Sequence, residues 1–106
     1  MYIIIFITTS NKKEAQKIAQ ALIAGKLAAC VNIIENIKSL FWWKAKVDFA
    51  HESLLIVKST KLKLAKIIRL VKSLHSYQVP EIIALPILAG NKDYLRWIDA
   101  SIRKSR

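Results

Sequence analysis

Residues 74–87, LHSYQVPEIIALPI, bring together the side chains of this chain that are best suited to chemistry: His75, Tyr77 and Glu81. A histidine near a carboxylate can bind a soft or borderline metal ion, and the single cysteine, Cys30, carries the other soft ligand of the chain. His75 and Cys30 are therefore the candidate metal ligands, for copper or another divalent cation. A lone histidine makes a poor site, however, and a formal net charge of +11 repels cations.

The same segment also has a structural interpretation, and the residue types favour it. His75 follows the last apolar residue of a predicted helix, where an imidazole can donate to unpaired carbonyls and complement the helix dipole. Tyr77 can pack its ring and bond its hydroxyl, and Pro80 favours an extended entry into a strand. On this interpretation residues 74–87 form a helix-to-strand junction.

The sequence lacks the common catalytic patterns: it has no glycine-rich phosphate loop, no nucleophile elbow and no His-Glu-x-x-His. Cys30 and His75 could pair as nucleophile and base. Cys30 lies in an apolar run, however, where a thiol is usually inert, and no third group is evident to orient the base. We expect no enzymatic activity.

The elements that position these residues begin with a strand and a helix. The β-branched and aromatic run at 2–8 predicts a strand within a sheet. Asn11 and Glu14 predict a capping box at the start of an amphipathic helix, which Gly25 ends in the C′ position. Residues 27–34 then predict a second strand.

The remainder of the chain predicts a long hairpin, two more helices and a fourth strand. The second strand continues through IKSLFWW after an irregularity near Glu35-Asn36, and a hairpin tip at 43–46 joins it to a third strand over 46–59. The later elements are a helix over 61–74, a strand over 81–88 and, after the break and cap at Gly90-Asn91, a final helix that ends in the basic tail RKSR. Pro86 favours an edge position for the fourth strand.

The predicted order is β-α-β-β-α-β-α. With right-handed crossovers it gives an α+β, ferredoxin-like split βαβ fold: an antiparallel sheet, a C-terminal helix and one domain over residues 1–106. The helices pack on one face of the sheet. The strands are apolar on both sides, so the second face also needs a cover, and another subunit is the simplest one.

Composition supports an assembly. Apolar residues make up 54% of the chain, more than a 106-residue domain can bury alone, because its surface is large relative to its volume. Monomers rarely expose large apolar patches, so we expect a homo-oligomer.

The charge balance, eighteen basic against seven acidic side chains, allows two interpretations: non-specific binding to polyanions, or lysine-rich helix faces in solvent. Specific nucleic-acid recognition is not expected, because the strands YIIIFIT and SLLIVKS lack the aromatics on which an RNA-recognition domain stacks bases. The N-terminal apolar run is too short to span a bilayer and no basic leader precedes it. The single cysteine fits a reducing cytoplasm.

Three stretches together resemble a known family: KLAACVNI at 26–33, SLFWWKAKVDFAHESLLIVKS at 39–59 and LHSYQVPEIIALPI at 74–87, followed by YLRWI. They are similar to the CutA divalent-cation tolerance proteins over nearly the full chain. The resemblance implies a ferredoxin-like subunit in a tight cytoplasmic homotrimer, linked to copper and other divalent-metal tolerance and not established as an enzyme.

The resemblance carries over only in part at the family's metal site. Some members have a histidine pair followed by proline, where this chain has Leu74, His75 and Ser76. A cysteine late in the first strand of those members corresponds to Ile7 here. Only His75 of that set is present.

The resemblance also implies a second function, a small-ligand sensor with pockets between subunits. Five residues match polar or aromatic positions that recur in the family and could line such a pocket: Glu52, Lys58, Tyr77, Glu81 and Trp97. The alternative for these residues is a hydrogen-bond network between subunits, because buried polar groups at an interface need partners.

Overall fold

The computed structural model describes residues 1–103, so most of the predicted basic tail lies outside the described residues. The elements are β1 (Tyr2–Thr9), α1 (Lys12–Ala24), β2 (Cys30–Trp43), β3 (Lys46–Thr60), the 3-10 turn η1 (Lys61–Lys63), α2 (Leu64–Leu74), β4 (Ile82–Pro86) and α3 (Lys92–Ile102). The strands form an antiparallel sheet in the order β2-β3-β1-β4. This confirms the α+β, ferredoxin-like prediction.

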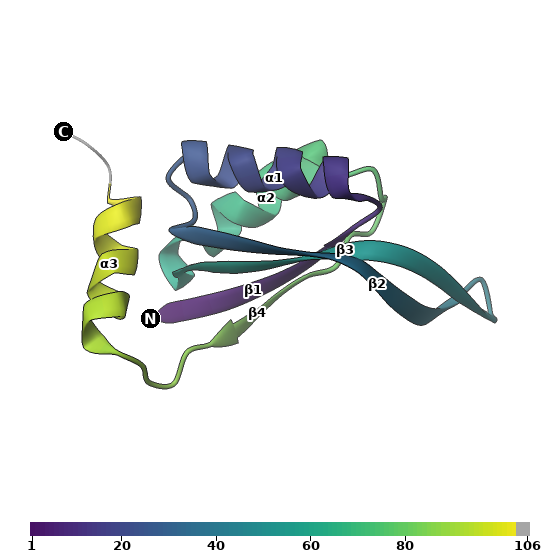
Figure 1. Cartoon of the computed structure of the whole chain (residues 1–106). Helices are drawn as coiled ribbons and strands as arrows, with labels where there is room; N and C mark the ends of the chain where they lie inside the picture. The colour runs from purple at the N-terminus through teal and green to yellow at the C-terminus, as the bar shows by residue number, and fades with distance from the viewer. Residues whose placement is uncertain (104–106) are drawn as a thin grey trace.

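The sheet is covered by helices on one face only (Figure 1). Helices α1 and α2 lie on that face, and alternate side chains of β1 and β3 fill the space beneath them. The core residues contributed by these four elements include Ile3, Ile5, Ile7, Leu55, Val57, Ile18, Leu22, Ile67 and Val71. Helix α3 stands at one end of the sheet, and the β2–β3 hairpin projects beyond the other strands at the opposite end.

The sheet's second face, here named the open face, is apolar and largely uncovered. Residues paired across antiparallel strands point to the same side, so the register places on this face Ile34, Leu54, Ile56, Ile4, Phe6, Ile83 and Leu85. Ile34 is 44% exposed and Ile83 is 52% exposed. On the same side of the sheet the hairpin adds exposed aromatics, with Trp43 at 52%. As predicted, the second face of the sheet is apolar, and within the described residues no helix covers it.

The end of α1 differs from the prediction. Gly25 has φ of −80° and caps the helix, while Lys26 takes the left-handed C′ conformation with φ of 56°. A Cβ on Gly25 would lie 3.3 Å from the Ala21 carbonyl oxygen, a tighter contact than most Cβ atoms make. The turn continues as the Leu27 and Ala28 amides donate to the Leu22 carbonyl, so β2 begins at Cys30 and not at 27.

The hairpin and its irregularity lie where the sequence predicts them. The register of β2 against β3 shifts between Ile34 and Ile37, and Asn36 has φ of 60°. Trp43 pairs with Lys46 across a two-residue loop in which Lys44 and Ala45 both have positive φ, 51° and 63°. Two such residues in sequence are the pattern of a type I′ turn, which normally selects Asn-Gly.

The last elements are close to the prediction. Strand β4 is shorter than predicted and lies at the sheet edge, as the proline indicated; Pro86 is its last residue and pairs with Ile3. Asn91 caps α3 by accepting a hydrogen bond from the Asp93 amide at 2.9 Å. The first turn of the predicted second helix is the 3-10 turn η1.

The hairpin turn yields the first prediction. Left-handed backbone costs roughly 1–2 kcal/mol for a residue with a side chain, so Ala45→Gly should raise the free energy of unfolding by about 0.5–1 kcal/mol after the added flexibility of the unfolded chain is deducted. Urea denaturation measures the change. Ala65→Gly, at an exposed position within α2, is the control and should lower stability by a similar amount. A loss of stability in Ala45→Gly would contradict the strain argument.

Candidate functional site

The predicted helix-to-strand junction folds into a polar cluster where β1 ends, α1 begins and α2 ends. We name it the junction cluster; its members are Thr8, Ser10, Glu14, Glu52, His75, Ser76 and Tyr77. Its side chains and amides come from three segments that are far apart in the sequence: residues 8–14, Glu52 and residues 75–77. The cluster lies at the end of the sheet from which the β2–β3 hairpin projects (Figure 1).

The imidazole of His75 is at the centre of the junction cluster, and its side chain is 0% exposed. The Tyr77 amide donates to Nδ1 at 3.0 Å, so Nε2 carries the ring proton and donates to the Thr8 carbonyl at 2.7 Å. Both ring nitrogens are therefore occupied. The prediction that the imidazole bonds the carbonyls of its own helix is wrong, because the ring reaches β1 instead. The α2 end is closed by the His75 amide, which donates to Val71.

Glu14 joins α1 to the segment after α2. The Glu14 amide donates to the Asn11 side chain at 2.8 Å, as a capping box requires. The carboxylate accepts from the Ser10 amide at 3.1 Å and, through its other oxygen, from the Ser76 amide at 2.9 Å. Burial raises the pKa of Glu14, but the hydrogen bonds from Ser76 and Ser10 outweigh it and hold this pKa below its ordinary value of 4.5.

Three of the predicted pocket residues meet beside this network. The Tyr77 hydroxyl donates to Glu52 at 2.8 Å, and Glu52 is 8% exposed. Burial and this hydrogen bond raise the pKa of Tyr77 to about 12. Burial, then the nearby charge of Glu52, raises the pKa of Glu81. Glu52, Tyr77 and Glu81 are thus electrostatically coupled at the base of the hairpin.

The other predicted residues lie toward the opposite end of the sheet. Cys30 pairs with Lys58 across β2 and β3, and the Lys58 ammonium contacts the Cys30 sulfur at 3.8 Å and the Asn32 side chain. Trp97 packs against Tyr94 with the ring centroids 5.3 Å apart. Burial, and then the Cys30 thiol, raise the pKa of Tyr94, which places α3 beside Cys30.

The two candidate metal ligands are therefore separated within one chain. Cys30 is in register with Lys58 and through it with Ile4, whereas His75 bonds the carbonyl of Thr8, four residues further along β1. That separation is about 13 Å at 3.3 Å per residue. Within residues 1–103, no group of three or more histidine, cysteine, aspartate or glutamate side chains is arranged so that it could hold a metal ion. The metal roles of His75 and Cys30 stay predictions.

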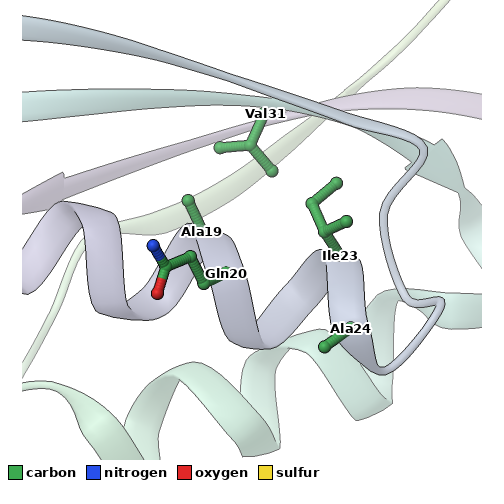
Figure 2. A pocket seen from close by; sticks show the side chains of 5 residues that line it. All are labelled: Ala19, Gln20, Ile23, Ala24 and Val31. Carbon is green, nitrogen blue, oxygen red and sulfur yellow. The ribbon is translucent and has the colours of Figure 1, made fainter.

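A shallow apolar groove of about 340 Å³ lies elsewhere, between α1 and β2. Figure 2 shows its lining: Ala19, Gln20, Ile23, Ala24 and Val31. None of these side chains titrates and none was a predicted site residue. The groove therefore offers apolar contact area and a single amide, with no chemistry.

Sequence reasoning missed the long-range partners of the junction cluster. It identified Glu14 as a capping residue, but its bond to Ser76 links positions 62 residues apart. One signal was available: a capping-box glutamate uses one carboxylate oxygen locally, and its second oxygen needs another hydrogen-bond donor. The Thr8 carbonyl gave no signal, since every residue carries a backbone carbonyl.

Comparisons with known proteins agree with this fold. The model of the family described as CutA1 divalent ion tolerance protein matches residues 3–101. The Divalent-cation tolerance protein CutA of Archaeoglobus fulgidus is 46% identical over 102 residues, covering 96% of this chain and 99% of that protein. The rice protein named Protein CutA 1, chloroplastic, is 45% identical over 103 residues, covering 97% of this chain but only 58% of the relative.

A solved structure matches over the same extent. The structure described as the periplasmic divalent cation tolerance protein CutA from Archaeoglobus fulgidus superposes with a TM-score of 0.94 at 46% identity, covering 97% of this chain and 100% of that one. Within residues 1–103, no helix is both long enough and apolar enough to cross a membrane.

The lowered pKa of Glu14 predicts how stability depends on pH. A carboxylate whose pKa is depressed by folding stabilises the protein above its unfolded pKa of about 4.5, and this stabilisation is lost as pH falls through the folded pKa. Glu14→Gln should therefore cost about 1–2 kcal/mol near pH 7, with the difference from the unmodified chain shrinking below pH 4.5.

Chemical denaturation at a series of pH values measures this difference. Glu35→Gln is the matched control, because Glu35 forms only an exposed ion pair with Lys12 at 3.4 Å and should change stability little at any pH. A Glu14→Gln penalty that stays constant down to pH 3 would show that the lost interaction is packing and not charge.

Proposed function

The chain belongs to the CutA1 divalent ion tolerance family, and from that premise we propose that it acts in the response to divalent cations, copper among them, as a homotrimer. In this proposal the chain is one domain over residues 1–106 and is not an enzyme. The names of the relatives supply the link to divalent cations, and the resemblance supplies the trimer.

The exposed apolar residues of the open face are the observation that supports the proposed trimer. Its residues Ile34, Ile83 and Leu85 are each more than two-fifths exposed in a single chain, next to partly buried neighbours on β1 and β3. The exposed hairpin side chains Phe41 and Trp43, which the register places on the same side of the ribbon as the open face, extend this apolar surface. Removing apolar surface from water contributes about 25 cal/mol per Å² to the free energy of association. Burial of the open face between three copies is therefore favourable.

The donors for a cation do not form a complete site within one chain. The described residues hold no group of three ligands, and both nitrogens of His75 are already hydrogen-bonded. The proposal therefore assigns cation binding to donors from more than one subunit, with His75 and Cys30 as the ligands to be tested. Coordination by His75 requires its ring to leave at least one of its present partners.

The cytoplasm is the compartment that we propose. Cys30 is a free thiol, and free thiols persist in reducing compartments. Two relatives carry the words chloroplastic and periplasmic in their names, so this part of the proposal needs its own measurement by cell fractionation.

A small-ligand sensor is the second candidate, and the coupled group Glu52, Tyr77 and Glu81 favours it. These residues lie at the base of the hairpin, and Glu52 shares the side of β3 that faces away from the helices with Leu54 and Ile56. A neighbouring subunit on the open face would close a pocket over them. Lys58 and Trp97 would face a separate region near α3. A thermal-shift screen in which no metabolite stabilises the assembly would exclude this candidate.

The trimer predicts a specific response to a charge on the open face. Ile83→Glu places a carboxylate on that face, where it costs little in a monomer but must be desolvated in the trimer. Sedimentation velocity should show a species of three times 12.1 kDa for the unmodified chain and a shift toward 12.1 kDa for the variant. Leu62→Glu, at a side chain 92% exposed on η1, is the control and should leave the assembly intact. A monomeric unmodified chain would overturn the proposal.

Copper binding is tested on the assembled protein. Titration against a competing chelator, with and without reductant, should show affinity that falls at least about 10-fold in Cys30→Ser and in His75→Ala. His51→Ala is the matched control, because His51 is exposed on β3 and packs only against Phe49. Circular dichroism and sedimentation confirm that each variant is folded and assembled. Unchanged affinity in both Cys30→Ser and His75→Ala would remove these ligands from the proposal.

A further inference from the structure

One side of the β2–β3 hairpin carries an exposed apolar surface that is not part of the open face. Between Lys46 and Glu52, β3 pairs only with β2, so this part of the hairpin is a two-stranded ribbon that projects from the sheet (Figure 1). The register places four large apolar side chains on the side of the ribbon that is continuous with the helix-covered face of the sheet. We name them the hairpin patch: Leu40, Trp42, Val47 and Phe49.

The hairpin patch is compact and accessible. Leu40 pairs with Phe49 and Trp42 pairs with Val47, so two cross-strand pairs lie next to each other on one side of the ribbon. These four side chains are between 57% and 75% exposed. Helices α1 and α2 lie over the other end of the sheet (Figure 1), and within residues 1–103 no helix covers the patch. A two-stranded ribbon has no interior, so only a partner surface can bury these side chains.

Lysines flank the hairpin patch. Residues 37–51 contain three lysines and a single acidic residue, Asp48. Lys38 lies on the same side as the patch, with its ammonium 5.1 Å from the centre of the Phe49 ring. Lys44 is exposed in the hairpin turn. Asp48 lies on the opposite side of the ribbon, where its carboxylate accepts a hydrogen bond from the Phe49 amide at 2.7 Å. The apolar side chains therefore lie between cations, with no carboxylate on their side.

We infer that the hairpin patch docks on the surface of an anionic lipid bilayer. Tryptophan and other apolar side chains enter the boundary between lipid headgroups and acyl chains, where tryptophan is enriched. Lysines beside them keep their methylene stems in this boundary and extend their ammonium groups to anionic headgroups. Trp42 and Phe49, flanked by Lys38 and Lys44, supply both kinds of contact. This peripheral binding goes beyond the proposed response to cations and does not rest on the trimer.

A second copy of the chain fits the hairpin patch less well than an anionic surface does. Each copy has a formal net charge of +11, so a contact between copies through a surface flanked by lysines brings like charges together. The patch and the open face also point to opposite sides of the sheet, so a copy that packs on the open face does not cover the patch by that contact.

Co-sedimentation with lipid vesicles tests the apolar contact. The vesicles consist of phosphatidylcholine alone or of phosphatidylcholine mixed with phosphatidylserine. The patch variant is Trp42→Thr with Phe49→Thr, which removes two exposed aromatic side chains and keeps residues that favour strands. The matched control is Leu62→Thr with Leu88→Thr, which removes two apolar side chains that are 92% and 100% exposed outside the hairpin.

A second pair of variants tests the charge contact. Lys38→Gln with Lys44→Gln removes two cations beside the patch, and Lys13→Gln with Lys92→Gln removes two exposed cations from α1 and α3. Both pairs change the net charge equally. Binding to the mixed vesicles should fall at least about 5-fold in the first pair and less than about 2-fold in the second.

The unmodified chain should bind the mixed vesicles at least about 10-fold more tightly than phosphatidylcholine alone. The patch variant should lose at least about 10-fold in affinity for the mixed vesicles, and its control less than about 3-fold. No binding to the mixed vesicles, or equal losses in the patch variant and its control, would overturn the inference. Sedimentation velocity without lipid identifies the other occupant: a patch variant that dissociates while the control stays assembled would assign the patch to a contact between copies, against the inference.

Discussion

The sheet's two apolar faces are the constraint on which the remaining structure depends. Two helices cover one face, while the other carries Ile4, Phe6, Leu54 and Ile56 with no helix above its centre. A domain of 106 residues has too little chain to cover both faces. In the proposed assembly, the second cover comes from other copies of the chain. This is why a chain that is 54% apolar can still form a well-ordered subunit.

Charge follows from the same arrangement. If the open face turns toward neighbouring subunits, the helix face becomes the outer surface of the assembly and remains in contact with solvent. Lysines on α1 and α2 keep their ammonium groups hydrated there, at little cost to the core. The carboxylates are placed where they have hydrogen-bond partners: Glu52 with Tyr77, and Glu14 with two amides. The two helices carry six of the eighteen basic residues, so the net charge is shared between the helix face and the rest of the chain.

Periodicity was sufficient to predict the order of elements and the fold class from the sequence, because the patterns at β1, α1 and α2 depend on local residue types alone. Local signals also identified the bulge near Asn36, the edge position of Pro86 and the Asn91 cap. What could not be predicted were contacts that depend on backbone groups. The left-handed residue at the end of α1 is Lys26 and not Gly25. Gly25 instead lies close to the Ala21 carbonyl, a backbone contact that has no sequence signature.

The sequence was sufficient to identify some residues of the candidate site, but not the contacts between them. His75 and Tyr77 were identified by residue type, yet their arrangement depends on the Thr8 carbonyl and the Ser76 amide, which have no sequence signature. Nothing in the sequence indicated that Tyr77 would donate a hydrogen bond to Glu52. Nor did it indicate that Cys30 would lie toward the opposite end of the sheet, paired with Lys58.

The tautomer of His75 links any cation binding at this residue to the stability of the fold. Nδ1 accepts from the Tyr77 amide and Nε2 donates to Thr8, so a metal ion can reach a ring lone pair only by displacing one of these bonds. The ring is fully buried, so displacement also opens the contact between β1, α1 and the end of α2. Binding at His75 then selects a locally open state, and its apparent affinity falls by the population of that state. Cations that bind elsewhere, at exposed groups on a subunit boundary, carry no such cost. The junction cluster therefore favours weak binding at His75, in competition with a hydrogen-bond network that already satisfies every polar group of the imidazole.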